Sequence, residues 1–247
     1  MKIPILVTAV VVLLALGTAA QAVIVIDDFT DFMTPVVAPA VLDTDGITDY
    51  GWYIKATALG VAYNYAETGL SIYGGTRNSS YTVYGSLSGT MMTMGSGWAT
   101  ENNGSSSWSQ STLTYDAGGA GLNLNLTSGT KLSVDRIFDH MGNLKNTVFS
   151  IKLDDGAQTA TVSKIWTSYV VSNVQVTDDF LFSSFLAQNG SLNLASIDKI
   201  TLYLETDKAG DYSLLTGLTT DAVPEPSSII ALVAGLGPLL AFRRRRA

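Results

Sequence analysis

The sequence contains no cysteine and a single histidine, His140. The absence of cysteine excludes disulfide bonds and thiol chemistry, so stability must come from the size of the core or from a bound metal. One histidine excludes zinc motifs built on two histidines and leaves a Ser-His-Asp triad only one candidate base. The Gly-x-Ser-x-Gly nucleophile motif is also missing. A hydrolase triad is therefore not expected.

The sequence has few charged residues, and acidic residues outnumber basic ones. Charged residues make up 14% of the chain and hydrophobic residues 47%, which is too apolar for a disordered protein. Between Val23 and Asp221 there are nine basic and twenty acidic residues. An acidic surface repels phosphate backbones, so nucleic-acid binding is disfavoured. About 200 residues between the two ends favour one large β-domain.

The N-terminus has the pattern of a secretory signal peptide. Lys2 precedes an apolar run from Ile5 to Leu16, and a segment of small residues then closes with Ala20, Gln21 and Ala22. The run is short for a membrane span, and Ala20 and Ala22 form an Ala-x-Ala cleavage site. We expect residues 1–22 to be removed, so that the mature chain begins at Val23.

The C-terminus combines three elements in order. Pro224, Glu225 and Pro226 are followed by apolar and small residues from Ile229 to Phe242, and then by Arg243, Arg244, Arg245 and Arg246. As a helix the apolar run covers about 21 Å of a hydrocarbon core about 30 Å thick, a marginal span. The arginines favour a cytoplasmic end, which places everything before Pro224 outside.

This C-terminal arrangement resembles the PEP-CTERM sorting signal. The resemblance covers residues 222–247 and implies recognition by an exosortase-type processing enzyme, with the C-terminal transmembrane helix holding the protein in the membrane before processing. It implies delivery to the cell envelope, cell surface or extracellular matrix of a Gram-negative-type bacterium. Other removable C-terminal anchors follow the same logic. The resemblance implies a cellular location but no biochemical activity.

The middle of the chain, residues 23–221, has a period of two. Apolar and polar residues alternate in Phe149–Leu153, Ile200–Leu204 and Leu122–Leu126, which predicts strands with one buried face. Gly-containing turns separate the segments at short intervals. Within Asp179–Gln188 the three phenylalanines fit either a strand or a single helical turn. We predict an all-β, jelly-roll-like β-sandwich between the signal peptide and the C-terminal helix.

Two short segments carry a second resemblance. Ile26-Asp27-Asp28-Phe29 and Gly74-Gly75-Thr76-Arg77, with the closing strand before the tail, resemble a recurrent type of uncharacterised exported β-protein that carries this sorting signal. They are also similar to carbohydrate-binding jelly rolls. The resemblance implies contact with glycans.

The strongest metal-binding pattern is formed by Asp43, Asp45 and Asp49 around Gly46. Carboxylates at positions one, three and seven around a glycine turn can direct oxygens at a structural Ca²⁺. The chain departs from the full calcium loop, because Ile54 stands where its final glutamate would be. The alternative is an ordinary Asp-Gly turn. Asp27 and Asp28 form a second, weaker metal candidate.

Aromatic side chains offer flat faces for sugar rings. Trp98 and Trp108 flank the polar segment 101–106, and Arg77 is a polar partner for a glycan. The alternative for each tryptophan is packing in the core.

Three functions remain open from the sequence. The first is a non-enzymatic surface or matrix protein that contacts extracellular polysaccharide. The second is a divergent glycoside-active enzyme, for which Glu67, Glu101 and Glu205 are candidate carboxylates. The third is a structural envelope protein without a ligand.

Overall fold

The computed structural model describes residues 23–31, 40–41, 50–54, 56–87, 90–95, 98–102, 108–137, 147–166, 175–206 and 211–221. Within the chain, Val23–Ala222 forms one compact unit. The predicted signal peptide, residues 1–22, and the predicted sorting segment, residues 222–247, lie outside the described residues. Among the described residues, no helix is long and apolar enough to cross a membrane.

The unit consists mostly of β-strands. In chain order the elements are β1 (Ile24–Asp27), β2 (Ala40–Val41), β3 (Tyr50–Ile54), β4 (Ala62–Thr68), β5 (Thr76–Tyr84), β6 (Thr90–Gly95), β7 (Trp98–Asn102), β8 (Trp108–Tyr115), the short 3-10 helix η1 (Ala117–Gly119), β9 (Lys131–Ile137), β10 (Thr147–Asp154), β11 (Thr159–Trp166), β12 (Gln175–Leu181), α2 (Phe182–Gln188), β13 (Lys199–Thr206) and β14 (Asp211–Thr220).

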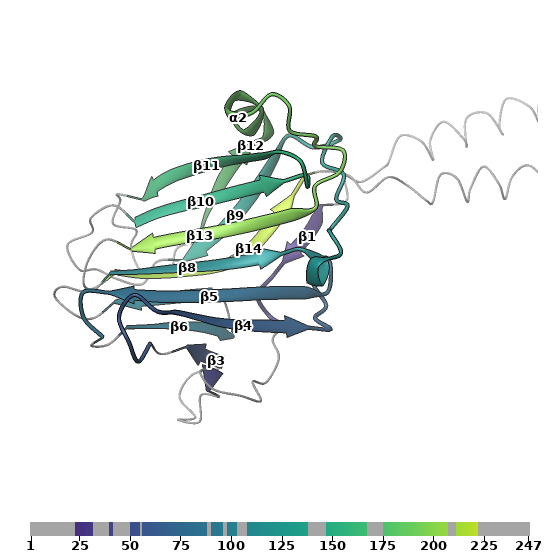
Figure 1. The fold of residues 1–247 in the computed structure, drawn as a ribbon. Helices are drawn as coiled ribbons and strands as arrows, with labels where there is room; N and C mark the ends of the chain where they lie inside the picture. The colour runs from purple at the N-terminus through teal and green to yellow at the C-terminus, as the bar shows by residue number, and fades with distance from the viewer. Residues whose placement is uncertain are drawn as a thin grey trace, which may run out of the picture. The chain divides into compact units, whose positions relative to one another are not determined.

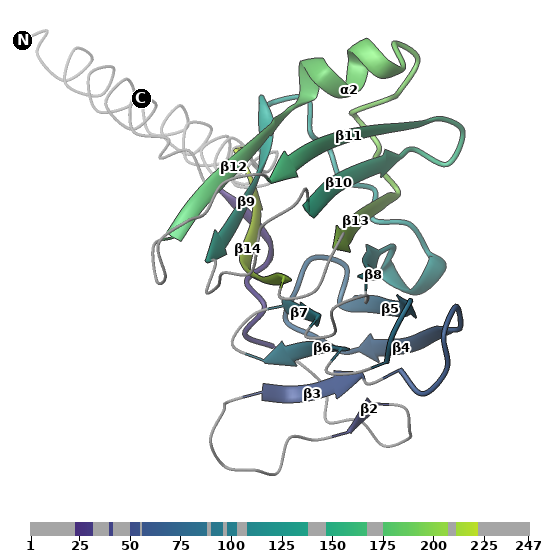
Figure 2. The ribbon, with the colours of Figure 1, turned by 90° about the vertical axis from the view of Figure 1, so that its left-hand side faces the viewer.

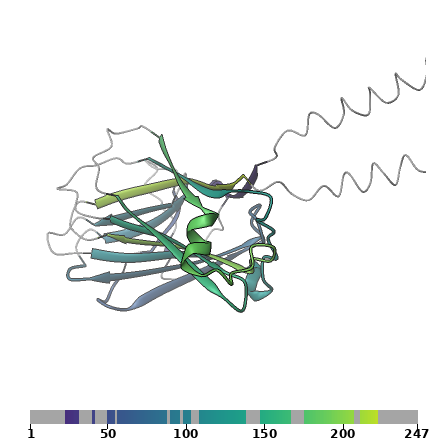
Figure 3. The ribbon, with the colours of Figure 1, turned by 90° about the horizontal axis from the view of Figure 1, so that it is seen from above.

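The strands form two antiparallel sheets that pack face to face (Figure 1). The eight-stranded sheet has the order β12-β9-β14-β7-β6-β3-β2, with β1 also paired to β14, and the six-stranded sheet has the order β11-β10-β13-β8-β5-β4. Seen from above, β14 and β4 lie in opposite layers (Figure 3). The prediction of an all-β domain built from two sheets is confirmed.

The last eight strands pair in a nested pattern. β10 pairs with β11, β9 with β12, β8 with β13 and β7 with β14, all antiparallel, and successive pairs alternate between the two sheets. The chain therefore folds as a long double-stranded hairpin wrapped around one core. The strands β4 and β5 extend one sheet, and β2, β3 and β6 extend the other.

The inner faces of both sheets supply the core. In β8 and β13 buried and partly exposed residues alternate along the whole strand, which is the burial pattern that a period of two predicts. Phe149 stacks on Trp166 with ring centroids 4.8 Å apart. The helix α2 lies beside β11 and β12 and buries Phe182 and Phe185 in the same core (Figure 2).

The two ends of the described unit lie side by side. Ile24 in β1 is opposite Thr220 in β14, so the chain enters and leaves at the same end of one sheet. The carboxylate of Asp221 accepts hydrogen bonds from the backbone N–H groups of Thr130 and Lys131, which fixes the end of β14. The last described residue is thus held three positions before Pro224.

Three local expectations change in the structure. Leu122, Leu124 and Leu126 are buried, but the segment forms only an isolated bridge to Ile197, because Asn123 has a positive φ of 49° that interrupts the extended backbone. The phenylalanine-rich segment holds both proposed elements, with Phe180 in β12 and Phe182 opening α2. The sequence did not predict β2, β3, β4 or β7.

Candidate functional site

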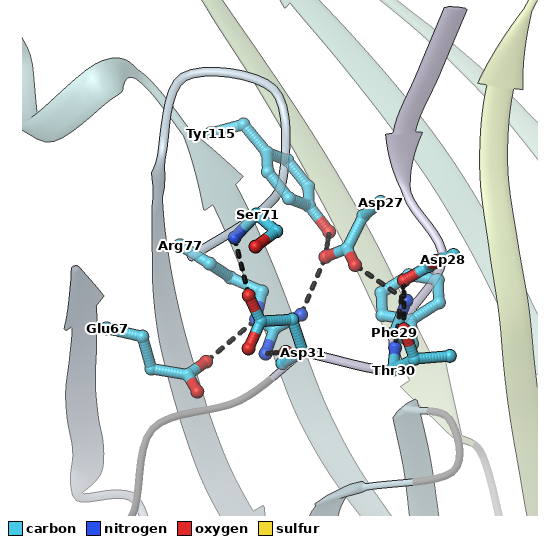
Figure 4. A network of polar contacts seen from close by, with 9 residues as sticks. All are labelled: Asp27, Asp28, Phe29, Thr30, Asp31, Glu67, Ser71, Arg77 and Tyr115. Atoms are coloured by element: carbon cyan, nitrogen blue, oxygen red, sulfur yellow. Dashed lines mark hydrogen bonds and ion pairs between the residues drawn. The ribbon is translucent and has the colours of Figure 1, made fainter. Parts of the chain in front are cut away.

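A buried ionic cluster surrounds Arg77 in β5. The side chain is fully buried, its Nη1 lies 2.7 Å from Oδ2 of Asp27, and its Nε lies 2.7 Å from Oε2 of Glu67 (Figure 4). Its Nη2 donates to the backbone carbonyl of Asp31 at 2.9 Å. Both carboxylates are also fully buried. One cation thus ties together β1, β4 and β5.

Asp27 is the centre of the hydrogen bonds in this cluster. The hydroxyl of Tyr115 donates to its Oδ2 at 2.8 Å, and the N–H of Phe29 donates to its Oδ1 at 2.7 Å. Phe29 has a φ of 56°, a strained value for a bulky residue, and its ring is fully buried. The Asx-type turn and the buried ring together anchor the segment that follows β1.

Burial dominates the electrostatics of the cluster. Loss of solvent raises the pKa of the Asp27 carboxyl, and the Arg77 charge acts in the opposite direction. Burial also raises the pKa of Tyr115 well above its usual range, so this phenol is protonated at neutral pH. For Arg77 burial works to lower the pKa, but the charge of Asp27 and the neighbouring groups outweigh it and raise the pKa. The guanidinium therefore stays charged.

The position of Arg77 corrects the expectation that it contacts glycan. It has no exposed surface to offer a ligand, because the strand pairing that places it beside Glu67 turns it toward the core. The guanidinium also occupies the position beside Asp27 that the weaker metal hypothesis assigned to a cation. The cluster is a structural element of the core.

The outer face of the six-stranded sheet carries an aromatic pair. Tyr84 at the end of β5 lies opposite Trp108 at the start of β8, and the rings stack with centroids 4.0 Å apart and an angle of 15° between their planes. Both side chains are partly exposed. This sheet lies toward the viewer in Figure 1. Stacking holds the two rings side by side and fixes their orientation on the surface.

A chain of polar side chains continues from this pair across β8 and β13. The Tyr84 hydroxyl donates to Oε1 of Gln110 at 3.2 Å, and Nε2 of Gln110 donates to Oε2 of Glu205 at 3.2 Å. The Tyr203 hydroxyl donates to the same Glu205 oxygen at 2.8 Å. Partial burial, followed by the hydrogen bond to Glu205, raises the pKa of Tyr203, so its hydroxyl is protonated at neutral pH.

We call Tyr84, Trp108, Gln110, Tyr203 and Glu205 the aromatic platform. It combines ring faces with hydroxyl, amide and carboxylate groups that are already held in place by one another. Aromatic rings pack against the apolar C–H face of a sugar, and fixed polar groups bond its hydroxyls. The platform has the chemistry to hold a carbohydrate.

The two tryptophans predicted as a glycan-contacting pair belong to different sheets. Trp108 begins β8 in the six-stranded sheet, and Trp98 begins β7 in the eight-stranded sheet. The side chain of Trp98 lies outside the described residues. Of the pair, Trp108 is the residue that the structure places in the platform.

The predicted calcium residues Asp43, Asp45 and Asp49 lie outside the described residues, as does His140. The structural Ca²⁺ therefore stays a prediction. In the part of the chain that the structure describes, no group of three or more histidine, aspartate or glutamate side chains is placed to hold a metal ion.

Tyr84 and Gln110 were missed from the sequence. Glu205 was considered only as a catalytic carboxylate, and Tyr203 only as the polar position of a strand. The sequence shows that these residues alternate with apolar ones, but it does not show that β8 lies between β5 and β13. Only that strand order brings the five side chains together.

Comparison with known proteins yields no family. No family model matches the chain, and no curated protein is significantly similar. Among solved structures, a family 11 carbohydrate-binding module from Clostridium thermocellum, in complex with a β-1,3-1,4-mixed-linked tetrasaccharide, is 13% identical, with a TM-score of 0.34 over 69% of this chain and 94% of that chain. TmCBM61 in complex with β-1,4-galactotriose is 11% identical, with a TM-score of 0.31 over 65% of this chain and 87% of that chain. These TM-scores lie below 0.5, so the likeness assigns neither a family nor a ligand.

Acid is expected to destabilise the domain through carboxylates whose pKa is lowered by folding, among them Asp155 and Asp179. The backbone N–H of Asn193, and then that of Gln158, lowers the pKa of Asp155, and the hydrogen bond from Lys131 lowers the pKa of Asp179. A pKa lowered by folding contributes stability above its unfolded value, about 3.9, which is lost as pH falls through the folded value. Asp27, with its raised pKa, acts in the opposite sense.

The thermal midpoint of the full chain should therefore hold between neutral pH and about pH 5 and fall as the pH drops below about 4. The Asp155→Asn variant should show a shallower fall, because it no longer exchanges a proton on unfolding. If the thermal midpoint of the variant fell with pH as steeply as that of the unmodified chain, Asp155 would not contribute to the loss of stability in acid.

Proposed function

We propose that the protein is an exported, non-enzymatic protein of the cell surface or extracellular matrix whose β-domain contacts polysaccharide. One observation carries the proposal, the aromatic platform on the outer face of the six-stranded sheet. A stacked Tyr84–Trp108 pair joined to three hydrogen-bonding side chains has no role in the core, since it lies on the face directed away from it. Its groups suit a sugar ring.

The domain is further proposed to be a jelly roll. The nested pairs β7–β14, β8–β13, β9–β12 and β10–β11, which alternate between the two sheets, support this topology. Along β4, β8 and β13 exposed or partly exposed side chains alternate with inward-facing ones, so the outer face of the six-stranded sheet presents side chains to solvent. It thus supplies a rigid surface for the platform.

The absence of catalysis is part of the proposal. A glycosidase needs two carboxylates placed on either side of a sugar. Among the described residues, the carboxyl groups of Asp27 and Glu67 share one ion-pair partner, Arg77, and both are fully buried. On the outer face, Glu205 accepts hydrogen bonds from Gln110 and Tyr203. This arrangement favours binding over bond cleavage.

A panel of soluble polysaccharides tests the function. In native gel electrophoresis with each polymer cast into the gel, the full chain in mild detergent should be retarded by at least one of them and should release no reducing ends. Retardation with release of reducing ends would favour the glycoside-active enzyme. No retardation by any polymer would favour a structural envelope protein.

We propose that delivery of the protein to the cell surface depends on Pro224, Glu225 and Pro226. If a processing enzyme reads this motif, replacing the three residues with alanine leaves the apolar segment 229–242 intact but stops cleavage. The uncleaved protein should then accumulate in the membrane at higher mass. Mass spectrometry of membrane and surface fractions measures this, and a mature surface protein that still carries Arg243–Arg246 would argue against processing.

A further inference from the structure

The outer face of the six-stranded sheet carries a continuous row of hydroxyl and amide side chains. Strand register places one member of the row on each strand, directly opposite the next. We call it the hydroxyl row, and its members from β4 to β11 are Asn64, Ser80, Thr112, Tyr203, Ser150 and Ser163. Tyr203 belongs to both the row and the aromatic platform.

Most side chains of the hydroxyl row are short, and the two at its β10–β11 end are held by a hydrogen bond. Ser150 and Ser163 share a hydrogen bond between their hydroxyls at 2.8 Å. Asn64 and Ser163 are exposed, Ser80, Thr112 and Tyr203 are partly exposed, and Ser150 is buried. Neighbouring strands lie about 4.8 Å apart, so a row across six strands is about 24 Å wide. That width accommodates several consecutive sugar residues.

Charge is nearly absent from this face. The outward positions of β4, β5, β8 and β11 include no charged side chain. On β10 and β13 they include two lysines and two acidic residues, Lys152, Asp154, Lys199 and Glu205, whose charges cancel. Lys199 and Asp154 lie 4.0 Å apart, and Glu205 is bonded within the platform.

The neutrality of this face contrasts with the rest of the domain. Twenty acidic and nine basic residues between Val23 and Asp221 make the whole domain strongly negative. An acidic polymer would meet that negative field with two lysines on this face to attract it, Lys152 and Lys199, of which Lys199 lies beside Asp154. A cationic polymer would meet no uncommitted carboxylate there. An uncharged polymer rich in hydroxyl groups is not repelled by the negative field and needs no free carboxylate.

We infer that the ligand is an uncharged polysaccharide, bound through an internal stretch of its chain that crosses the strands along the hydroxyl row. The inference rests on the proposed function and names its ligand class. Hydroxyl groups of the sugar exchange hydrogen bonds with the row, and the aromatic platform, which shares Tyr203 with the row, flanks the bound chain on the side toward Trp108 and Tyr84. Because the contacts are between neutral groups, binding is insensitive to salt.

Matched polymers test the ligand class. Several neutral backbones are each paired with an acidic derivative of the same backbone, such as hydroxyethyl cellulose with carboxymethyl cellulose, at low and high salt. The full chain should bind at least one neutral polymer with the same affinity at both salt concentrations, and its acidic partner at least tenfold more weakly.

The outcomes separate the inference from the function on which it rests. Binding restricted to acidic polymers and lost at high salt would overturn the neutral ligand while leaving polysaccharide binding intact. Failure to bind any polymer would overturn both.

Variants locate the contact. Replacing Ser80 with alanine and Thr112 with valine removes two adjacent hydroxyls of the row and keeps strand-compatible residues. Affinity for the neutral polymer should fall about tenfold, the loss that about 1.4 kcal/mol of contact energy produces. Thr219→Val, on the outer face of the other sheet, is the matched control and should bind as the unmodified chain does. Equal binding by both variants would overturn the row as the contact.

Discussion

The Arg77→Met variant is expected to lose most of its stability against unfolding. Methionine fills much of the arginine volume but leaves Asp27 and Glu67 buried without their cation. Removing one partner of a buried ion pair typically costs about 3–5 kcal/mol, and here two carboxylates lose the same partner. Since domains are stable by about 5–15 kcal/mol, the variant should be near the threshold of folding. Urea unfolding of the full chain, followed by tryptophan fluorescence, measures the loss.

Two further variants separate charge from packing. Adding Asp27→Asn and Glu67→Gln to Arg77→Met removes the buried charges and should recover part of the lost stability. Lys131→Met breaks the partly exposed pair with Asp179 and should cost much less stability than Arg77→Met, because solvent screens the pair. If Arg77→Met were no more destabilising than Lys131→Met, the cluster would not stabilise the fold as argued.

The Trp108→Ala variant is expected to lose polysaccharide binding while remaining folded. Tryptophan supplies about 150–250 Å² of contact area, and its ring also holds Tyr84 in place. Affinity should therefore fall at least tenfold, or about 1.4 kcal/mol. The thermal midpoint should change little, because Trp108 lies on the outer face and outside the buried core. Titration with the polymer that retards the unmodified chain measures the affinity.

A matched control is available on the other sheet. Leu181 is 48% exposed on β12, which belongs to the eight-stranded sheet. Its replacement with alanine removes a large exposed apolar side chain that is not part of the platform. Leu181→Ala should bind as the unmodified chain does. If Trp108→Ala and Leu181→Ala bound equally well, the platform would not be the binding site.

The sequence predicted the class of the fold because strand periodicity is local. In β13 the apolar residues Ile200, Leu202 and Leu204 alternate with polar ones, and all three are fully buried. The strand β4 escaped prediction because its inward positions include a charged residue. Tyr63, Tyr65 and Glu67 occupy them, and the glutamate is tolerated there only because Arg77 lies opposite on β5.

The platform could not be predicted from the sequence because it depends on strand order. Tyr84 and Trp108 are 24 positions apart, and Glu205 is 95 positions from Gln110. Nothing in the local pattern shows that β13 pairs with β8 or that the polar positions of these strands face one surface. The polar neighbours of Trp108 indicated that it is not in the core, and it is partly exposed. Arg77 was misplaced because an arginine after a glycine turn has the composition of a surface loop.

Contact between the outer face of the six-stranded sheet and polysaccharide is the central claim, and nuclear magnetic resonance tests it most directly. Spectra of the ¹⁵N-labelled full chain in mild detergent are recorded with and without a short neutral oligosaccharide of the polymer that binds. We expect the largest shifts at the Trp108 indole N–H and at backbone amides of β5, β8 and β13. Unchanged spectra, or shifts confined to the eight-stranded sheet, would contradict the claim.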